Sequence, residues 1–245
     1  GIGDGIMFAS VIPDLLRTAK SVSYLGSGRL NRLLQRSFPE ITTYTFEHMK
    51  IIDKTQIDLC VLVGSLCFAF RPSIQSFPHT SYLVPDPEKT RLWRNRIQGD
   101  GRKVIGISWR GGWTFLNKDG RSLSLQDFSP LFQKDNCIFV NLQFGDTKIE
   151  VDDVQKANSL EILSFDPQEL FDIDDLAALI NAVDRVITVQ NTNVHICGAI
   201  GKKCDALLPS IPEWRYGLEG DEMYWYGSVN LHRRIAEADP SVILK

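Results

Sequence analysis

The sequence contains few of the residues that build metal sites and disulfide frameworks. It has five cysteines and four histidines in 245 residues, with no CxxC pair and no Cys/His spacing typical of zinc. An odd number of cysteines cannot all pair, so we expect buried free thiols in a reducing compartment. These residues are Cys60, Cys67, Cys137, Cys197 and Cys204. The sequence therefore predicts a cytoplasmic protein that needs no metal.

One-sided charge and long apolar runs are also lacking. The net charge is -3, and the basic residues are scattered singly, which argues against a nucleic-acid partner. The longest apolar run, residues 59–70, is interrupted by Gly64 and Ser65 and is shorter than the ~18 to 20 residues of a membrane helix. No secretory signal is visible. We expect no transmembrane segment and a small soluble ligand.

Short runs of Val, Ile and Leu alternate with amphipathic stretches through most of the chain, which is typical of parallel βαβ units. The predicted fold class is α/β. The length suits two domains, and a connector with two prolines and a glycine pair covers residues 85–101. We therefore predict Rossmann-like domains at residues 1–98 and 99–245.

The first half is predicted to contain helices at residues 6–20 (bent at Pro13), 29–36 and 88–98, and strands at 22–25, 58–63 and 82–84. The second half is predicted to contain strands at 104–108, 138–142, 160–163, 185–189 and 205–208. Ligands of open parallel sheets bind beyond the carboxyl ends of the strands. The residues that follow each strand are therefore the candidates for a site.

The segment after the strand at 185–189 is the first candidate. Asn191 or Thr192 can cap the helix that follows, and the free amides of a helix start favour a diphosphate. His195 lies one turn further on and could donate a hydrogen bond to a phosphate oxygen. Taken alone, the segment favours an ordinary capped helix with a solvent-facing histidine over a diphosphate site.

The segment after residues 104–108 strengthens the diphosphate interpretation. Ser108 leads into Trp109, Arg110, Gly111 and Gly112. Glycines let a backbone approach a ligand, and arginine suits phosphate oxygens. The alternative is a simple turn with a surface arginine. Arg121 could add a second positive charge, or merely precede the next helix.

Two further segments carry polar residues at strand or helix ends. Gln143 and Gly145 could contact a base or ribose, although Gly145 could equally serve a turn in which Asp146 caps the next helix. Asp4, between glycines and before a helix, could be a general base, an N-cap, or both.

Two patterns in the sequence are rejected as cofactor or metal motifs. Gly26 and Gly28 lack the third glycine of a dinucleotide fingerprint, because Asn31 stands in its place, so no NAD site is expected. The acidic group Asp172, Asp174 and Asp175 imitates a DxD metal motif, but we interpret it as the start of a helix.

Several segments in order, GIGDGIMFASVIPDLL, SWRGG, LQFGD, DIDDLAALINAVDRVITVQNTNVHICGAIGK and LLPSIPEWRYG, resemble bacterial glycosyltransferases of the heptosyltransferase-like family. The branch often found behind tetratricopeptide repeats is the most similar. The resemblance implies a GT-B fold with an acceptor domain and a sugar-donor domain facing across a cleft. It also implies metal-free, inverting transfer from a nucleotide-diphosphate sugar, which is a substrate, so no cofactor is expected.

The resemblance also assigns roles to residues. Asp4 matches the catalytic base, Ser108 and Arg110 the phosphate-contacting loop, and Thr192 with His195 the diphosphate-binding turn. Heptosyltransferases usually carry Asp where this chain has Gln190 or Asn191, and Lys in place of Arg110, so neither the sugar nor the nucleotide follows from the motifs.

Two expectations concern the whole protein. The family's first strand precedes the GxGD segment, so we expect that strand, and a repeat domain, to belong to a longer polypeptide. The acceptor is expected to be a saccharide or protein hydroxyl. An inactive module that binds a nucleotide sugar, or serves as a scaffold, is the alternative function.

Overall fold

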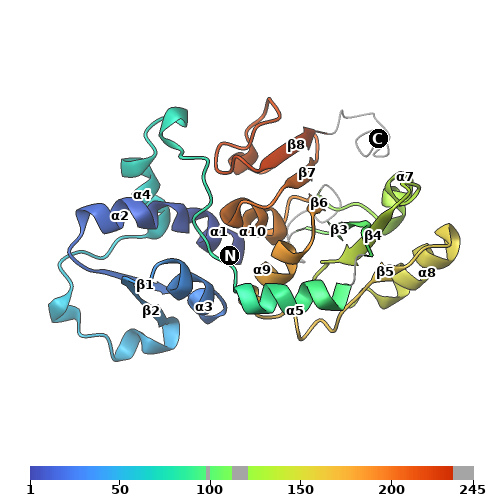
Figure 1. Cartoon of the computed structure of the whole chain (residues 1–245). Helices are drawn as coiled ribbons and strands as arrows, with labels where there is room; N and C mark the ends of the chain where they lie inside the picture. The colour runs from blue at the N-terminus through green and yellow to red at the C-terminus, as the bar shows by residue number, and fades with distance from the viewer. Residues whose placement is uncertain (98–99, 112–120, 234–245) are drawn as a thin grey trace.

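The computed structural model describes residues 1–97, 100–111 and 121–233 and has the expected α/β class (Figure 1). The amino-terminal part comprises α1 (Ile2–Phe8), η1 (Ala9–Val11), α2 (Ile12–Thr18), β1 (Val22–Gly26), α3 (Gly28–Ser37), β2 (Ile41–Thr45), η2 (Phe46–Lys50), η3 (Lys54–Gln56), α4 (Val63–Phe70), η4 (Ile74–Ser76) and α5 (Pro87–Ile97). Here η denotes a 3₁₀ helix.

The carboxyl-terminal part comprises β3 (Lys103–Ser108), η5 (Leu125–Phe128), α7 (Ser129–Phe132), β4 (Cys137–Asn141), α8 (Lys148–Asn158), β5 (Ile162–Leu163), α9 (Ile173–Ala182), β6 (Arg185–Val189), α10 (Thr192–Ile200), β7 (Cys204–Leu208), η6 (Trp214–Tyr216) and β8 (Val229–Arg233). The predicted domain boundary at residues 98 and 99 lies outside the described residues. Within those residues, no helix is long and apolar enough to span a bilayer.

The larger sheet is parallel and has the strand order β5-β4-β3-β6-β7-β8. From β3 the chain adds β4 and then β5 on one side. It then crosses back, places β6 on the other side of β3, and adds β7 and β8 beyond it. Such a reversal leaves a crevice at the carboxyl ends of the two central strands, here β3 and β6. The fold therefore places the segments after Ser108 and Val189 at the expected ligand position.

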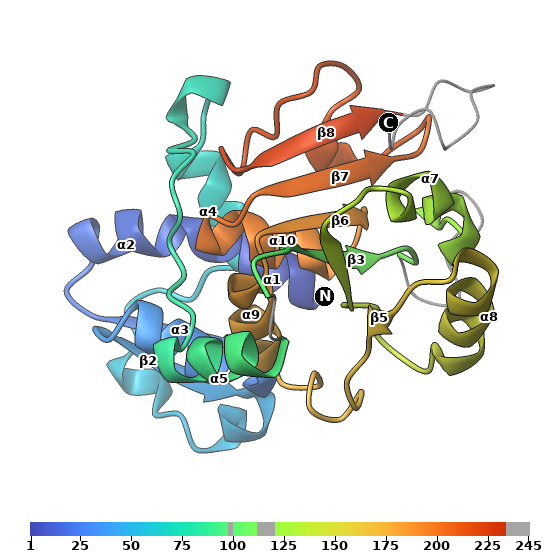
Figure 2. The same ribbon diagram turned by 45° about the vertical axis from the view of Figure 1, so that its right-hand side comes forward.

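Alternate residues of the strands pack into two separate apolar cores, as expected for a sheet covered on both faces. Val104, Val140 and Val186 belong to the core with α9 and α10, whereas Ile105 and Ile107 belong to the core with η5, α7 and α8. Figure 2 shows α9 and α10 on one side of the sheet and α7 and α8 on the other.

The amino-terminal part shares the first of these cores. Ile6 of α1, Leu33 of α3 and Trp93 of α5 belong to the same buried cluster as Leu179 of α9 and Val194 of α10. Helix α1 packs on α10, while α3 and α5 pack on α9. Contacts between helices thus join the two parts, and α1 brings Asp4 toward α10.

The sheet of the amino-terminal part differs from the prediction. It consists of β1 and β2, paired in parallel; β2 was not predicted because its sequence, ITTYT, is largely polar. The predicted strand at 58–63 is wrong: its apolar residues Leu59 and Leu62 are exposed, and none of its residues pairs with a described strand. The predicted strand at 82–84 is also wrong, because the amides of Tyr82 and Leu83 both donate to the carbonyl of Ala199 in α10.

Two more predictions need correction. The helix expected at 6–20 is divided into α1, η1 and α2, with Pro13 in the first turn of α2, a position that proline tolerates. Of the cysteines, only Cys197 and Cys204 are buried, while Cys60 is exposed. The apolar run around Cys60 therefore led to two wrong predictions, the strand at 58–63 and the burial of Cys60.

Candidate active site

The loops after β3 and β6 touch at the centre of the large sheet. A Cβ atom on Gly111 would lie 2.6 Å from the backbone oxygen of Gln190, so only glycine allows this approach. The amide of Gly111 donates to Ser122 Oγ at 3.2 Å. Residues 112–120, which include Gly112 of the predicted loop, lie outside the described residues.

Asn191 connects the two loops and caps α10. Its Oδ1 accepts a hydrogen bond from the amide of Asn193 at 2.9 Å, as an N-cap does. Its Nδ2 donates to Ser108 Oγ at 3.0 Å and to the carbonyl of Arg110 at 3.2 Å. Thr192, the first residue of α10, is half-buried. Helix α10 therefore begins at Thr192, directly after the predicted cap Asn191.

Ser108 is fully buried and its hydroxyl has several partners. Its Oγ lies 2.5 Å from Thr188 Oγ1 and accepts from the side-chain amides of Asn191 and Asn193 at 3.0 and 2.9 Å. The second amide hydrogen of Asn193 reaches the carbonyl of Leu142 at 3.1 Å. In this arrangement the Ser108 hydroxyl holds the two loops together, and its contact with a phosphate stays a prediction.

Arg110 extends along the β4 side of the crevice. Its guanidinium pairs with Glu150 of α8, and Glu150 also accepts from Trp109 Nε1 at 2.6 Å. Gln143 fixes the backbone of the same loop: its Oε1 accepts from the amides of Trp109 and Arg110 at 2.9 and 2.7 Å. The structure thus brings Gln143 to the Arg110 loop, with its carbonyl oxygen already used for loop support.

His195 lies on the other side, between α1 and β8. It is 3% exposed; its Nδ1 is 3.0 Å from the hydroxyl of Tyr226, and a Cβ on Gly3 would collide with its ring. Burial, with a smaller contribution from Arg215, lowers the pKa of His195 to about 3 against the opposing effect of Asp4. The ring is therefore neutral at pH 7, and the solvent-facing alternative for His195 is wrong.

Sequence reasoning missed the cation that approaches Asp4. Arg215 Nη1 donates to Asp4 Oδ1 at 2.7 Å, and Arg215 Nη2 lies 2.8 Å from Glu213 Oε2. Glu213 also pairs with Arg121, and its amide donates to Gln190 Oε1 at 3.2 Å. This cluster joins α1 to the loop after β6. The IPEWRYG segment was the only sequence signal for it.

The carboxylate of Asp4 is 39% exposed and ionised. Its Oδ2 also accepts from the amino terminus of Gly1 at 2.9 Å. Burial raises the pKa of Asp4, but the hydrogen bond from the amino terminus and the charge of Arg215 outweigh it, so the pKa is lowered overall. Asp4 is the third residue of α1 after its N-cap Gly1, and its carboxylate accepts from the nitrogen of that cap, so Asp4 supports the cap without being the N-cap itself.

The loops after β4 and β5 present aromatic rings to solvent. Phe144 is 64% exposed and Phe171 is also exposed, and the guanidinium of Arg29 lies 4.3 Å from the Phe171 ring centre. Gly145 has a φ of +95° with open space around it. An open cavity of about 460 Å³ lies between α8 and the segment after β5, lined in part by Asp146, Lys148 and Phe165.

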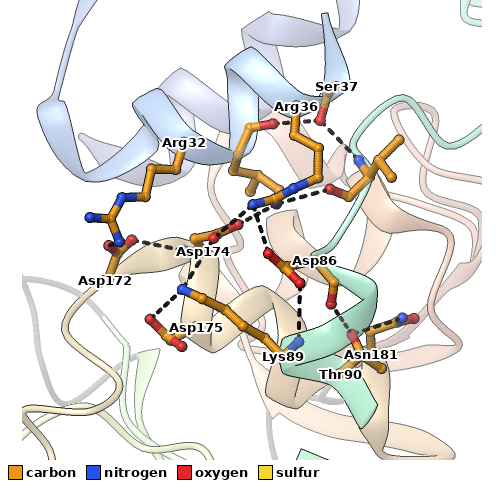
Figure 3. A network of polar contacts seen from close by, with 12 residues as sticks. Arg32, Arg36, Ser37, Asp86, Lys89, Thr90, Asp172, Asp174, Asp175 and Asn181 are labelled. Carbon is orange, nitrogen blue, oxygen red and sulfur yellow. Dashed lines mark hydrogen bonds and ion pairs between the residues drawn. The ribbon is translucent and has the colours of Figure 1, made fainter. Parts of the chain in front are cut away.

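The acidic group at residues 172–175 opens a helix, as predicted. Asp172 is the N-cap of α9 and accepts from the amide of Asp174. The carboxylate of Asp174 pairs with Arg36 and Lys89, and that of Asp175 pairs with Lys89 (Figure 3). Across the described ranges, no three His, Cys, Asp or Glu side chains are grouped so as to hold a metal ion.

The chain is similar in sequence to part of a longer protein. No protein-family model matches the chain. Protein FlbA of Caulobacter vibrioides is 29% identical over 248 residues, covering 94% of this chain and 41% of FlbA. The chain thus spans about two fifths of the length of that relative.

Two solved structures resemble nearly the whole chain. The structure of E. coli ADP-heptose LPS heptosyltransferase II superposes with a TM-score of 0.65 at 15% identity, covering 99% of this chain and 93% of that one. A glycosyl transferase of family 9 from Veillonella parvula superposes with a TM-score of 0.59 at 13% identity, covering 99% and 88%. At such identities the likeness establishes the fold, and the chain has the fold of these glycosyltransferases.

Proposed function

We propose that this chain is an inverting, metal-independent glycosyltransferase that moves a sugar from a nucleotide-diphosphate donor to an acceptor hydroxyl. The main support is the position of Asp4. This carboxylate from the amino-terminal part lies on Arg215, beside the start of α10 at the strand reversal of the large sheet. The shared fold with two glycosyltransferases supports the same reaction class.

In the proposed reaction, Asp4 takes the proton of the acceptor hydroxyl. The hydroxyl oxygen attacks the anomeric carbon of the sugar, and the bond from that carbon to the diphosphate breaks with its electrons staying on the diphosphate. Attack opposite the leaving group inverts the anomeric carbon. Asp4 remains ionised at neutral pH because its pKa is lowered, so it is ready to accept a proton.

The leaving diphosphate needs positive charge and hydrogen-bond donors that are already in place. The free amides at the start of α10, near Asn191 and Thr192, supply donors at the positive end of the helix dipole. The close contact between Gly111 and Gln190 keeps the loops in position. Arg110 can face the diphosphate if it exchanges Glu150 for a phosphate oxygen, a move that a surface arginine makes at small cost.

Two buried nitrogen atoms give independent support for an anionic ligand. In the described ranges, Gln190 Nε2 and Arg215 Nε are buried and have no hydrogen-bond acceptor. Leaving a buried donor unpaired costs about 1–3 kcal/mol, and an oxygen-rich ligand would recover that cost. His195, being neutral, would align Tyr226 and α1 instead of contributing charge. Gln143 and Gly145 would shape the nucleoside end of the same crevice.

Replacing Asp4 with Asn tests the proposal. We expect transfer to fall by at least about 100-fold, because general-base catalysis contributes roughly 10²–10⁴-fold, with sugar-donor binding nearly unchanged. The sugar donor is found first by thermal shift with ADP-, UDP-, GDP- and TDP-sugars, since a ligand of the folded state raises its apparent stability. Asp53→Asn, at an exposed 3₁₀-helix cap, is the matched control; full activity in Asp4→Asn excludes the base role.

A second function, a nucleotide-sugar-binding or scaffold module without turnover, is favoured by one observation. Asp4 Oδ1 is held by the guanidinium of Arg215, as in a structural ion pair. This alternative predicts that a nucleotide sugar raises the melting temperature, while no nucleoside diphosphate is released with any saccharide or protein acceptor. Release of the nucleoside diphosphate together with a glycosylated acceptor would exclude it.

A further inference from the structure

Arg215 contacts two acidic groups from a mostly buried position. Its side chain is 13% exposed, and its two terminal nitrogens are divided between Asp4, at 2.7 Å, and Glu213, at 2.8 Å. Arg215 and Asp4 are 211 positions apart along the chain. Because the guanidinium is planar and each terminal nitrogen binds a different carboxylate, it fixes the orientation of the two carboxylates as well as neutralising their charge. An ammonium group has no such fixed geometry.

The position of Arg215 is itself fixed by the segment after β7, which contacts the loop after β6. Glu213 holds one end of the guanidinium, pairs with Arg121 and donates its amide to Gln190 Oε1 at 3.2 Å. The indole of Trp214 lies beside the guanidinium, 5.5 Å from its central carbon. These contacts hold the guanidinium at a fixed position relative to the strand reversal of the sheet. The guanidinium in turn holds Asp4.

We propose that Arg215 is the positioning residue of the site, which holds the Asp4 carboxylate at a fixed place and orientation relative to the start of α10. The role as positioner of a catalytic base rests on the proposed function. With Oδ1 held by Arg215, Oδ2, which also accepts from the nitrogen of Gly1 at 2.9 Å, is the oxygen that receives the acceptor proton. Arg110, which sequence reasoning selected, pairs with Glu150 on the β4 side and has no described contact with Asp4.

The charges that face Asp4 predict how its titration responds. The side chains that face this carboxylate are the guanidinium of Arg215 and the neutral ring of His195. Removing Arg215 removes a positive charge and a hydrogen bond to the ionised form, so the pKa of Asp4 must rise. An ion pair that only fastened α1 to the loop would also change stability, so stability alone does not test the role.

The first test measures Asp4 directly in the ligand-free protein. The carboxyl carbon of ¹³C-labelled Asp4, assigned with Asp4→Asn, is titrated by NMR in the wild type, Arg215→Met and Arg215→Lys. We expect a higher pKa in Arg215→Met and an intermediate one in Arg215→Lys. Arg91→Met, at an exposed pair with Glu88, is the control and leaves the pKa unchanged. An unaltered Asp4 pKa in folded Arg215→Met overturns the proposal.

The second test uses transfer with the nucleotide sugar found by thermal shift. We expect kcat of Arg215→Met to fall about 100-fold, since small misplacements of a reacting group cost that much. The acid limb of the kcat/KM profile should move to higher pH. If Arg215→Met does not fold, Arg215→Lys carries both tests. Unchanged kcat in a folded variant overturns the role, whereas an NMR shift in a protein without transferase activity rejects only the proposed function.

Discussion

At the scale of single residues, Gly111 decides whether the loops after β3 and β6 can touch. The 2.6 Å separation between its hypothetical Cβ and the oxygen of Gln190 involves backbone on both sides. A side chain there cannot rotate away, so one of the loops has to move. Such overpacking typically costs about 1–3 kcal/mol.

Gly111→Ala is therefore expected to lower the free energy of unfolding by about 1–3 kcal/mol and to weaken binding of the nucleotide sugar. Urea unfolding measures the first effect and thermal shift the second. Gly64→Ala is the control: its new Cβ would approach only the edge of the Phe8 ring, at 3.3 Å, and alanine favours the helix. Equal stability and ligand response of Gly111→Ala and wild type would contradict the importance of this contact.

What the sequence reveals at this scale depends on distance along the chain. Ser108, Gly111 and Asn191 were selected because each lies at the carboxyl end of a strand of one parallel sheet, and the structure brings Asn191 to Ser108 and Gly111 against Gln190. Arg215 could not be selected in this way, because its contact with Asp4 depends on how α1 packs against α10. The direction of the Arg110 side chain could not be predicted either, because it depends on where α8 places Glu150.

At the scale of elements, the start of α9 holds three helices together. Asp174 is 1% exposed and pairs with Arg36 of α3 at 2.5 Å and with Lys89 of α5 at 3.2 Å. Figure 3 shows these side chains converging from the three helices. If this carboxylate were lost, Arg36 would keep Asp86 and Lys89 would keep Asp175, but the buried hydrogen bonds that join α9 to α3 and α5 would be lost.

Asp174→Ala is expected to lower the free energy of unfolding by about 1.5–3 kcal/mol at pH 7, the usual contribution of hydrogen bonds to a charged group, because both cations keep a second acidic partner. Asp175→Ala, at an acid that is 29% exposed, should cost about 1 kcal/mol or less. Burial raises the pKa of Asp174, but Arg36 and Lys89 outweigh it and lower the pKa below 3.8 overall. The stabilisation is therefore complete above pH 3.8 and is lost as pH falls through the folded-state pKa.

Urea unfolding of both variants and the wild type at several pH values checks this prediction. The gap between wild type and Asp174→Ala should stay constant from pH 7 to pH 5 and narrow below about pH 4. A gap as small as that of Asp175→Ala at pH 7 would show that the cluster contributes little to the packing of α3 and α5 on α9.

The sequence predicted elements well where both faces of a strand are buried. Strands β3, β4, β6 and β7 were predicted to within one residue, because continuous apolar runs are typical of buried parallel strands. Strand β8 was missed because polar residues alternate along it, and it lies at the edge of the sheet. Residues 58–63 show the converse, since an apolar run without a neighbouring strand forms no sheet.

At the scale of the whole molecule, His195 lies where the two parts meet. His195 belongs to α10, the helix that starts at the strand reversal. Its ring is packed between Gly3 of α1 and Tyr226. Charging that ring in place would put an unpaired cation in an apolar junction near Arg215. The junction is therefore expected to be sensitive to acid well before the carboxylates of the protein titrate.

The sign of this effect follows from the pKa values. The folded-state pKa of His195 is lowered from 6.5 to about 3 by burial and by Arg215, so below pH 6.5 the unfolded chain binds a proton that the folded chain does not. The stability associated with neutral His195 is complete above pH 6.5 and is lost as pH falls, with a slope of up to about 1.4 kcal/mol per pH unit. Replacing the ring with an uncharged side chain removes that slope.

We expect His195→Gln to be less stable than wild type at pH 7, because it leaves a poorly filled site, but less dependent on pH between pH 6.5 and pH 5. His48, His79 and His232 are present in both proteins, so their contributions cancel in the difference. Urea unfolding at half-unit pH steps gives the two slopes, and NMR of the His195 ring gives the titration directly. Parallel stability curves would mean that the ring is protonated in the folded protein, and the junction between α1 and α10 would then have to tolerate a buried cation.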